Sequence, residues 1–199
     1  MNIHPSALVH PNTKIHPSVH IGPFVCIEEN VEIGEGTIIE NNATICSNTT
    51  IGKNCHVFQG AVVGGLPQDL KYQGEETYTI IGDNTVLREF VTVHRGTASK
   101  KQTVVGNACL IMAYCHVAHD CVLGDHIIMS NATQLAGEVV VDDYAIIGGG
   151  SLVHQFTHIG GHVMIQGGSK VNKDIPPYTM IAREPICFCG INSVGLKRR

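Results

Sequence analysis

Aliphatic residues recur at every sixth position along almost the whole chain. The series runs from Ile3 to Val63, from Ile81 to Val93 and from Val105 to Val171, with one methionine, Met129, among its members. A small or β-branched residue often stands two positions earlier, and glycine often follows. A period of six fits neither a helix nor a regularly alternating strand. It predicts an all-β fold, a parallel β-helix in which three short sides close a coil of about eighteen residues and coils stack about 4.8 Å apart.

The six-residue register is interrupted twice, near residues 64–80 and near residues 95–104, and resumes in phase after each break. We therefore expect two loops that project outward from an intact solenoid, and such loops commonly carry function. The pattern ends after Val171. These features predict a β-helix over residues 1–174 and a capping segment over residues 175–199.

A cluster of candidate catalytic groups follows from stacking residues eighteen positions apart. Gly137 then lies above His119, and Glu138 lies above Asp120. A histidine beside a carboxylate is a common general-base pair. A nearby glycine N–H can stabilise an oxyanion. We expect His119 to point outward and Glu138 to lie one coil from Asp120, so that the two carboxylates raise the pKa of one of them.

Two other interpretations of these histidines compete with the catalytic one. Twelve histidines are many for this length, and most need have no catalytic role. His126, Tyr144 and His162 share one column and are expected to form a surface ladder of rings. A zinc site needs imidazoles that converge from adjacent coils. No two histidines are eighteen positions apart, so no metal site is expected.

The composition limits the possible binding partners and the cellular location of the protein. The net charge of −4 argues against nucleic-acid binding, and no apolar run approaches the roughly 20 residues of a membrane span. The N-terminus lacks the pattern of a secretory signal. Eight cysteines without a CxxC pair indicate reduced thiols in a cytoplasmic protein rather than disulfides or a zinc ribbon. Four of them fall on the small inward position of the repeat: Cys55, Cys109, Cys115 and Cys121.

Several motifs together give a more specific indication. They are Gln68-Asp69-Leu70-Lys71-Tyr72, Val93-His94-Arg95-Gly96-Thr97, His116-Val117-Ala118-His119-Asp120, Leu135-Ala136-Gly137, Val153-His154-Gln155-Phe156 and Gly195-Leu196-Lys197-Arg198-Arg199. In this order the chain resembles the hexapeptide-repeat family of UDP-N-acetylglucosamine O-acyltransferases, which begin lipid A synthesis. The resemblance implies a left-handed β-helix, which the period alone does not.

The resemblance also implies a reaction and its participants. A 3-hydroxyacyl chain moves from acyl carrier protein to the 3-hydroxyl of UDP-N-acetylglucosamine, without cofactor or metal and without membrane insertion, in a homotrimer with sites between subunits. His119 matches the general base, Asp120 the acid that orients it and Gly137 the oxyanion-hole amide. The other matches are to substrate-binding positions: Gln68, Asp69, Lys71, His116, His154, Gln155, Asn192 and Arg198. Gly167 matches the position that sets acyl chain length, on a coil above the catalytic one, and glycine there predicts a long chain.

The chain departs from the family pattern in three respects. Members usually continue beyond the position of Arg199 into a helical domain, so the resemblance makes residues 175–199 a candidate for the start of a missing helical domain. Glu138 stands where many members have histidine, and we expect it to contact polar groups of the substrate. Val194 stands where an acid is common. Two alternatives stay open: a related transferase that uses acyl-CoA or another sugar nucleotide, such as a 3-amino sugar, and a non-enzymatic or zinc-dependent β-helix trimer.

Overall fold

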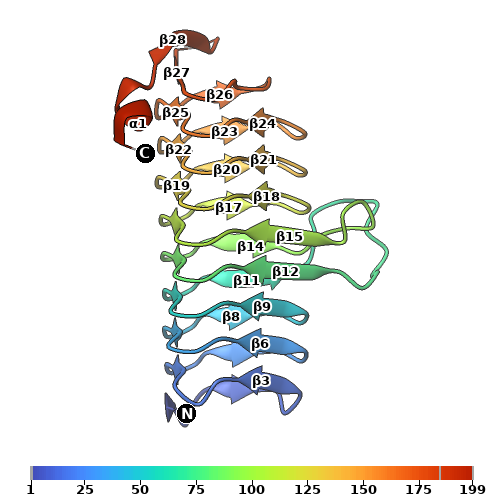
Figure 1. Ribbon diagram of the computed structural model, residues 1–199. Coiled ribbons are helices and arrows are strands. Elements are labelled where there is room, and N and C mark those ends of the chain that lie inside the picture. The colour runs from blue at the N-terminus through green and yellow to red at the C-terminus, as the bar shows by residue number, and fades with distance from the viewer. Residues whose placement is uncertain (1, 184, 199) are drawn as a thin grey trace.

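A computed structural model describes residues 2–183 and 185–198 as a left-handed parallel β-helix, which confirms the predicted fold class. The coils stack in one column, and the two loops project from the same side (Figure 1). Within the described residues, the three sides form sheets of 11, 9 and 8 strands. We call them sheets A, B and C, in the order in which the chain meets them.

The strands are two to five residues long, because each side of the coil is short. Sheet A contains β1 (Asn2–Ile3), β4 (His20–Ile21), β7 (Ile38–Ile39), β10 (His56–Val57), β13 (Val86–Leu87), β16 (Leu110–Ile111), β19 (Ile128–Met129), β22 (Ile146–Ile147), β25 (Met164–Ile165), β27 (Thr179–Ala182) and β28 (Cys187–Ile191). Sheet B contains β2 (Leu8–Val9), β5 (Cys26–Ile27), β8 (Thr44–Ile45), β11 (Val62–Gly65), β14 (Thr92–His94), β17 (His116–Val117), β20 (Gln134–Leu135), β23 (Leu152–Val153) and β26 (Lys170–Val171). Sheet C contains β3 (Thr13–Ile15), β6 (Val31–Ile33), β9 (Thr49–Ile51), β12 (Tyr78–Ile81), β15 (Gln102–Val105), β18 (Val122–Leu123), β21 (Val140–Val141) and β24 (His158–Ile159).

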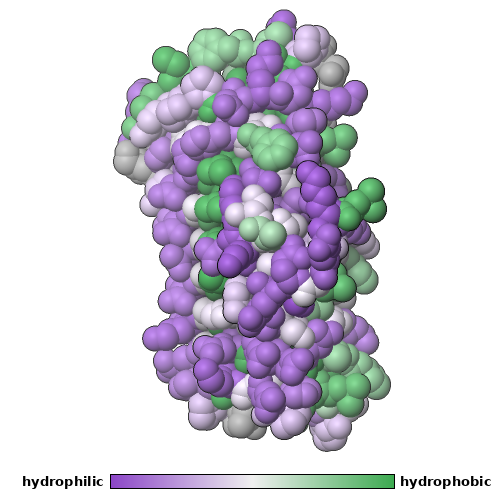
Figure 2. Space-filling model, turned by 90° about the vertical axis from the view of Figure 1, so that its right-hand side faces the viewer, coloured by the Kyte–Doolittle hydropathy of each residue, from purple (hydrophilic) through white to green (hydrophobic). Residues whose placement is uncertain are grey.

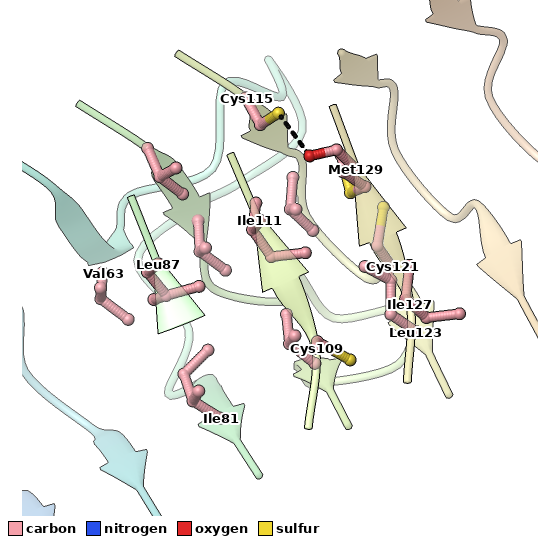
Figure 3. Close-up of a cluster of buried hydrophobic side chains, with 14 of the residues drawn as sticks. Val63, Ile81, Leu87, Cys109, Ile111, Cys115, Cys121, Leu123, Ile127 and Met129 are labelled. Atoms are coloured by element: carbon pink, nitrogen blue, oxygen red, sulfur yellow. Dashed lines mark hydrogen bonds between the residues drawn. The ribbon is translucent and has the colours of Figure 1, made fainter. Parts of the chain in front are cut away.

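The core is a ladder of like residues. Ile111, for example, pairs with Leu87 below and Met129 above, and all three are fully buried (Figure 3). The four cysteines of the small inward position are buried beside this ladder as unpaired thiols, as predicted: Cys55, Cys109, Cys115 and Cys121. Only 5% of the residues are aromatic, so the core is built from many small aliphatic side chains instead.

The corners repeat a left-handed residue at their second position. Asn54, Asp120 and Tyr144 adopt φ values of 52°, 59° and 63°. Asparagine and aspartate tolerate this region better than most residues, whereas the aromatic residues there gain by stacking. The predicted ring ladder is present: His126, Tyr144, His162 and Tyr178 stack with centroid distances of 4.6, 4.9 and 4.8 Å.

The two loops span residues 66–77, between β11 and β12, and residues 95–101, between β14 and β15. They lengthen the repeat locally. Val62 pairs with Thr92, thirty positions on, and Thr92 pairs with His116, twenty-four positions on. The regular spacing of eighteen returns where His116 pairs with Gln134. The coils on both sides stay in register because the extra residues are accommodated outside the stacked strands.

The parallel ladder continues past residue 174. Strand β27 pairs in parallel with β25, so that Ile181 extends the core, and β28 then pairs antiparallel with β27. A short helix, α1 (Ser193–Arg198), follows. None of the helices in the described residues is long and apolar enough to cross a membrane.

Candidate active site

A cleft of about 520 Å³ lies where loop 66–77 faces the corners between sheets B and C. Figure 2 views the molecule from the side on which the loops project, and hydrophilic residues cover most of that side. The cleft brings together seven of the predicted site residues, along with Leu70 and Phe156: Gln68, Asp69, Lys71, His119, Gly137, Glu138 and Gln155. They come from four separate segments of the chain.

A histidine–carboxylate pair stands at the wall of this cleft, with His119 lining the cleft and Asp120 buried behind it. Nδ1 of His119 lies 2.8 Å from Oδ2 of Asp120, in the corner between β17 and β18. The Asp120 carboxylate is completely buried, whereas 18% of the His119 side chain is exposed. Because a carboxylate only accepts hydrogen bonds, this contact favours the tautomer with the proton on Nδ1. The lone pair of Nε2 is then free to accept a proton in the cleft.

The Asp120 carboxyl group is held in its ionised form. Burial raises its pKa, but hydrogen bonds from Thr97, His119 and Lys100 together outweigh burial and lower the pKa below its usual value. Our expectation that neighbouring carboxylates would raise a pKa is therefore wrong at Asp120. The spacing rule showed that Glu138 lies one coil away but could not show the donors around Asp120.

Gly137 lies against the His119 ring, on the next coil. A Cβ atom added to Gly137 would stand 2.5 Å from Nε2 of His119. No group in the described part of the chain accepts a hydrogen bond from the Gly137 N–H. At the equivalent place on another corner, the Lys53 N–H donates to Asp83 Oδ1, one coil further on. The coil above Gly137 offers Gln155 instead, so the Gly137 N–H stays available beside Nε2.

Two predicted residues lie next to the cleft without lining it. His116 is part-buried on β17, and its Nδ1 lies 2.7 Å from Thr92 Oγ1. Burial and then the charge of His119 lower the pKa of His116. His154 Nδ1 lies 3.0 Å from the carbonyl oxygen of Gln155. These contacts orient both rings beside the His119–Asp120 pair, which we call the dyad.

Gly167 is not in the same column as His119. It occupies the corner between β25 and β26, close to Gly149, whereas His119 occupies the corner between sheets B and C. Forty-eight positions are not a whole number of eighteen-residue coils, so the two residues lie at different corners of the chain. The role of Gly167 in setting acyl chain length stays a prediction.

The C-terminal residues are also remote from the dyad. Asn192 lines a separate pocket together with Val194. Its amide is already engaged, since Nδ2 donates to the His162 carbonyl and Oδ1 accepts from the Gly195 N–H. The side chain of Arg198 lies outside the described residues.

The eighteen-residue stacking rule did not predict several residues around the dyad. Thr97 and Lys100 contact Asp120 although they lie on loop 95–101, and His94 packs edge-to-face on His116 with centroids 4.7 Å apart. Loop 95–101 increases the separation between paired residues on adjacent coils from eighteen to twenty-four positions, so the eighteen-residue rule does not place these residues together. In the described residues, no group of three or more His, Cys, Asp or Glu side chains is arranged to hold a metal ion.

His94 predicts a specific pH dependence of stability. Burial, followed by the charges of His116 and His119, lowers its pKa from 6.5 to about 4. Between these values the unfolded chain binds a proton that the folded chain does not. Stability at neutral pH should therefore fall as the pH drops through 6.5 towards 4, at up to about 1.4 kcal/mol per unit.

We expect the free energy of unfolding in urea to fall by about 2 kcal/mol from near pH 7.5 to near pH 5 on account of His94. His94→Gln removes the titrating group and should flatten that part of the curve. An unaltered slope in His94→Gln would contradict the assignment.

The chain is similar to known proteins in sequence and in fold. Residues 3–104 match the family model for the GMPPB C-terminal domain, and residues 174–199 match the model for domain 2 of Udp N-acetylglucosamine O-acyltransferase. A UDP-N-acetylglucosamine acyltransferase structure from Bacteroides fragilis 9343 is 51% identical, with a TM-score of 0.97, and the match covers 99% of this chain and 77% of that one. The acyltransferase structure from Francisella novicida is 46% identical with the same TM-score, over 99% and 73% of the two chains.

A sequence relative from Pseudomonas savastanoi pv. phaseolicola is an acyl-[acyl-carrier-protein]–UDP-N-acetylglucosamine O-acyltransferase. It is 46% identical over 144 residues, which is 72% of this chain but only 56% of the relative. The fold and the corner dyad define a left-handed β-helix protein of the hexapeptide-repeat class. Within that class, the chain belongs to the UDP-N-acetylglucosamine acyltransferase family.

Proposed function

We propose that the protein transfers a 3-hydroxyacyl chain from acyl carrier protein to the 3-hydroxyl of UDP-N-acetylglucosamine, the first step of lipid A synthesis. The observation that carries the proposal is the His119–Asp120 pair facing the free Gly137 N–H in a cleft walled by Gln68 and Lys71. Family membership supports the same reaction.

The mechanism follows from the orientation of the imidazole. Nε2 of His119 takes the proton of the acceptor hydroxyl while the hydroxyl oxygen attacks the thioester carbonyl. Asp120 stabilises the imidazolium that forms, and the Gly137 N–H donates to the oxyanion. The carbon–sulfur bond then breaks, and the proton on His119 passes to the departing sulfur. An ester and a free thiol result, with no metal or cofactor in the scheme.

The remaining cleft residues supply contacts to the sugar nucleotide. Lys71 places a cation at the cleft, which suits a diphosphate, and Glu138 and Gln155 offer polar groups to a sugar. Ser99 Oγ lies 3.2 Å from Glu138 Oε1, which orients that carboxylate at the cleft wall.

The direct test is incubation of the protein with UDP-N-acetylglucosamine and a 3-hydroxyacyl carrier protein, followed by mass analysis of the nucleotide. We expect the mass of the acylated nucleotide. Parallel incubations with acyl-CoA and with a 3-amino sugar nucleotide test the two related transferase reactions. Product only in one of those incubations, or in none, would overturn the proposal.

We further propose a homotrimer. The outward positions of sheet A form an apolar stripe, and the start of the C-terminal helix borders only its upper end, at Ile146, Met164 and Met180. Its members alternate with the core residues of the same strands: Val86, Leu110, Ile128, Ile146, Met164 and Met180. A continuous apolar stripe of this kind favours contact with another copy. A second copy is also required to bring a Gly167 corner near a His119 corner.

Free thiols at all eight cysteines fit a reducing, cytoplasmic location.

The assembly can be tested by charging the stripe. Sedimentation at micromolar concentration should give three times the chain mass for the native protein and a smaller mass for Ile128→Asp. Thr50→Asp is the matched control, because Thr50 is an exposed outward residue of sheet C. A native protein that is monomeric and fully active would contradict the trimer.

Gly167 leads to a prediction about acyl chain length. The corner that contains Gly167 and the same corner of the preceding coil lack side chains at four positions: Gly149, Gly150, Gly167 and Gly168. If this bare corner of a second copy receives the chain, each buried methylene contributes about 0.8 kcal/mol, or about fourfold in affinity. The native enzyme should prefer chains of about fourteen carbons or more over about ten, and Gly167→Met should reverse the order. UDP-N-acetylglucosamine binding should be unchanged in that variant, and an unchanged chain preference would refute this role.

A further inference from the structure

The Asp120 carboxylate is surrounded by donors from a loop rather than by a paired cation. The Thr97 N–H donates to Oδ1 at 2.9 Å and the Thr97 hydroxyl donates to Oδ2 at 2.6 Å, while the Lys100 N–H reaches Oδ1 at 3.1 Å. Oδ2 is therefore shared between the Thr97 hydroxyl and His119 Nδ1. A carboxylate held at both oxygens cannot rotate, so the direction of its bond to His119 is fixed.

Thr97 itself stays away from the cleft. Only 7% of the residue is exposed, and it does not line the cleft that holds His119. Among the described residues, the charged or titratable groups around Asp120 are His119, Glu75, the buried Cys121 thiol and Lys100, whose Nζ donates to the Asp120 carbonyl. Thr97 therefore acts on the substrate only through Asp120 and His119.

Loop 95–101 has a conformation that neighbouring segments hold on both sides. Its Gly96 N–H donates to the Tyr78 carbonyl, and its Ala98 N–H donates to a carboxylate oxygen of Glu75. A Cβ at Gly96 would stand within 2.2 Å of the Gln102 nitrogen, so the turn requires glycine. Glu75 belongs to loop 66–77, which also carries the cleft residues Gln68 and Lys71. The loop that holds the Asp120 carboxylate is thus hydrogen-bonded to the loop that lines the cleft.

We propose that Thr97 is a positioning residue, which fixes the Asp120 carboxylate so that His119 presents Nε2 to the cleft. The inference rests on the proposed acyl transfer and adds to it a residue that the repeat pattern does not reveal. A buried hydrogen bond to a charged group has a large effect because the carboxylate has no water to replace the lost donor.

Thr97→Val tests the proposal, since it keeps the side-chain shape and the backbone N–H but removes the hydroxyl. We expect kcat to fall about tenfold or more with KM changed by less than about twofold. The acid limb of the rate profile should move to higher pH, because the carboxylate loses a donor that favours its ionised form. Thr97→Ser keeps the hydroxyl and should restore both the rate and the profile. Thr97→Ala removes the hydroxyl with a smaller side chain and gives the same test if valine does not fit.

Thr85→Val is the matched control. Thr85 also has a buried hydroxyl, which donates to the Gly106 carbonyl and accepts from the Cys109 N–H, away from the cleft. Its loss should lower stability without moving the pH profile. If Thr97→Val behaves like Thr85→Val, with an unshifted acid limb and near-native kcat, the proposal is overturned while the acyl transfer stands.

A second readout does not depend on activity. The proton between His119 Nδ1 and Asp120 should give a downfield NMR signal in the native protein and in Thr97→Ser, and the signal should be lost or shifted upfield in Thr97→Val. Absence of acyl transfer by the native protein would remove the proposed function, and this signal would still decide the positioning role. An identical signal in Thr97→Val would overturn it.

Discussion

Replacing His119 with alanine should lower kcat for acyl transfer at least about a hundredfold, the usual scale for removing a general base. The acceptor hydroxyl would then have to lose its proton to water in a cleft where Nε2 is the placed acceptor. The KM for the sugar nucleotide should change much less, because the polar contacts from Gln68, Lys71 and Glu138 remain. Steady-state rates with the carrier-protein donor measure both quantities.

The fold should survive this substitution. His119 sits in a corner with part of its side chain exposed, so its removal opens no cavity in the aliphatic ladder. Asp120 would retain its three donors from Thr97 and Lys100. His4→Ala is the matched control, since His4 is an exposed histidine on the first coil. Near-native turnover by His119→Ala would eliminate the proposed base.

The six-residue period predicts the solenoid well, because each coil repeats the same packing problem. A position that faces inward on one coil, such as Leu87, must face inward on the next, at Ile111, or the ladder would contain a polar side chain. The same logic predicts the small cysteines beside the ladder. Handedness does not follow from the period, and here it came from the family resemblance.

The central part of the site was also predictable from the spacing of its residues in the sequence. His119 and Asp120 are adjacent in the chain, and Gly137 is one regular coil further on, so no loop intervenes between these residues. The corner conformation then turns the two side chains towards each other. The structure adds the buried position of Asp120, which adjacency alone does not reveal.

Contacts that cross a loop were not predictable in this way. Thr97 meets Asp120 because loop 95–101 folds back over the corner, and its six added residues break the eighteen-residue rule. The acidity of Asp120 depends on those same contacts. Gly167 was placed by its match to the family and not by stacking on His119, and the structure puts it at a different corner, between sheets A and B.

Replacing Gly137 with alanine should be nearly as damaging as removing His119, although it adds only one methyl group. The new Cβ would stand 2.5 Å from both Cε1 and Nε2 of His119 and 3.2 Å from Nδ1, so the ring cannot stay where it is. Its displacement breaks the 2.8 Å contact between Nδ1 and Asp120. A shift of about 1 Å in a catalytic group can cost about a hundredfold in rate, and we expect a loss of kcat on this scale.

The glycine's surroundings make this variant a clean probe of the dyad. The atoms that the methyl group would meet belong to a partly exposed side chain, whereas at Gly106 they include backbone atoms of Gly124 at 2.4 and 2.6 Å. Gly137→Ala should therefore fold with native stability, and Gly106→Ala should not. Gly161→Ala is the active control, because its closest contact is the Asp143 carbonyl oxygen at 3.2 Å. The downfield signal of the His119–Asp120 proton should disappear in Gly137→Ala and persist in Gly161→Ala. Normal turnover by Gly137→Ala would mean that catalysis does not use the ring in this position, since the backbone N–H of residue 137 survives the substitution and only the imidazole has been moved.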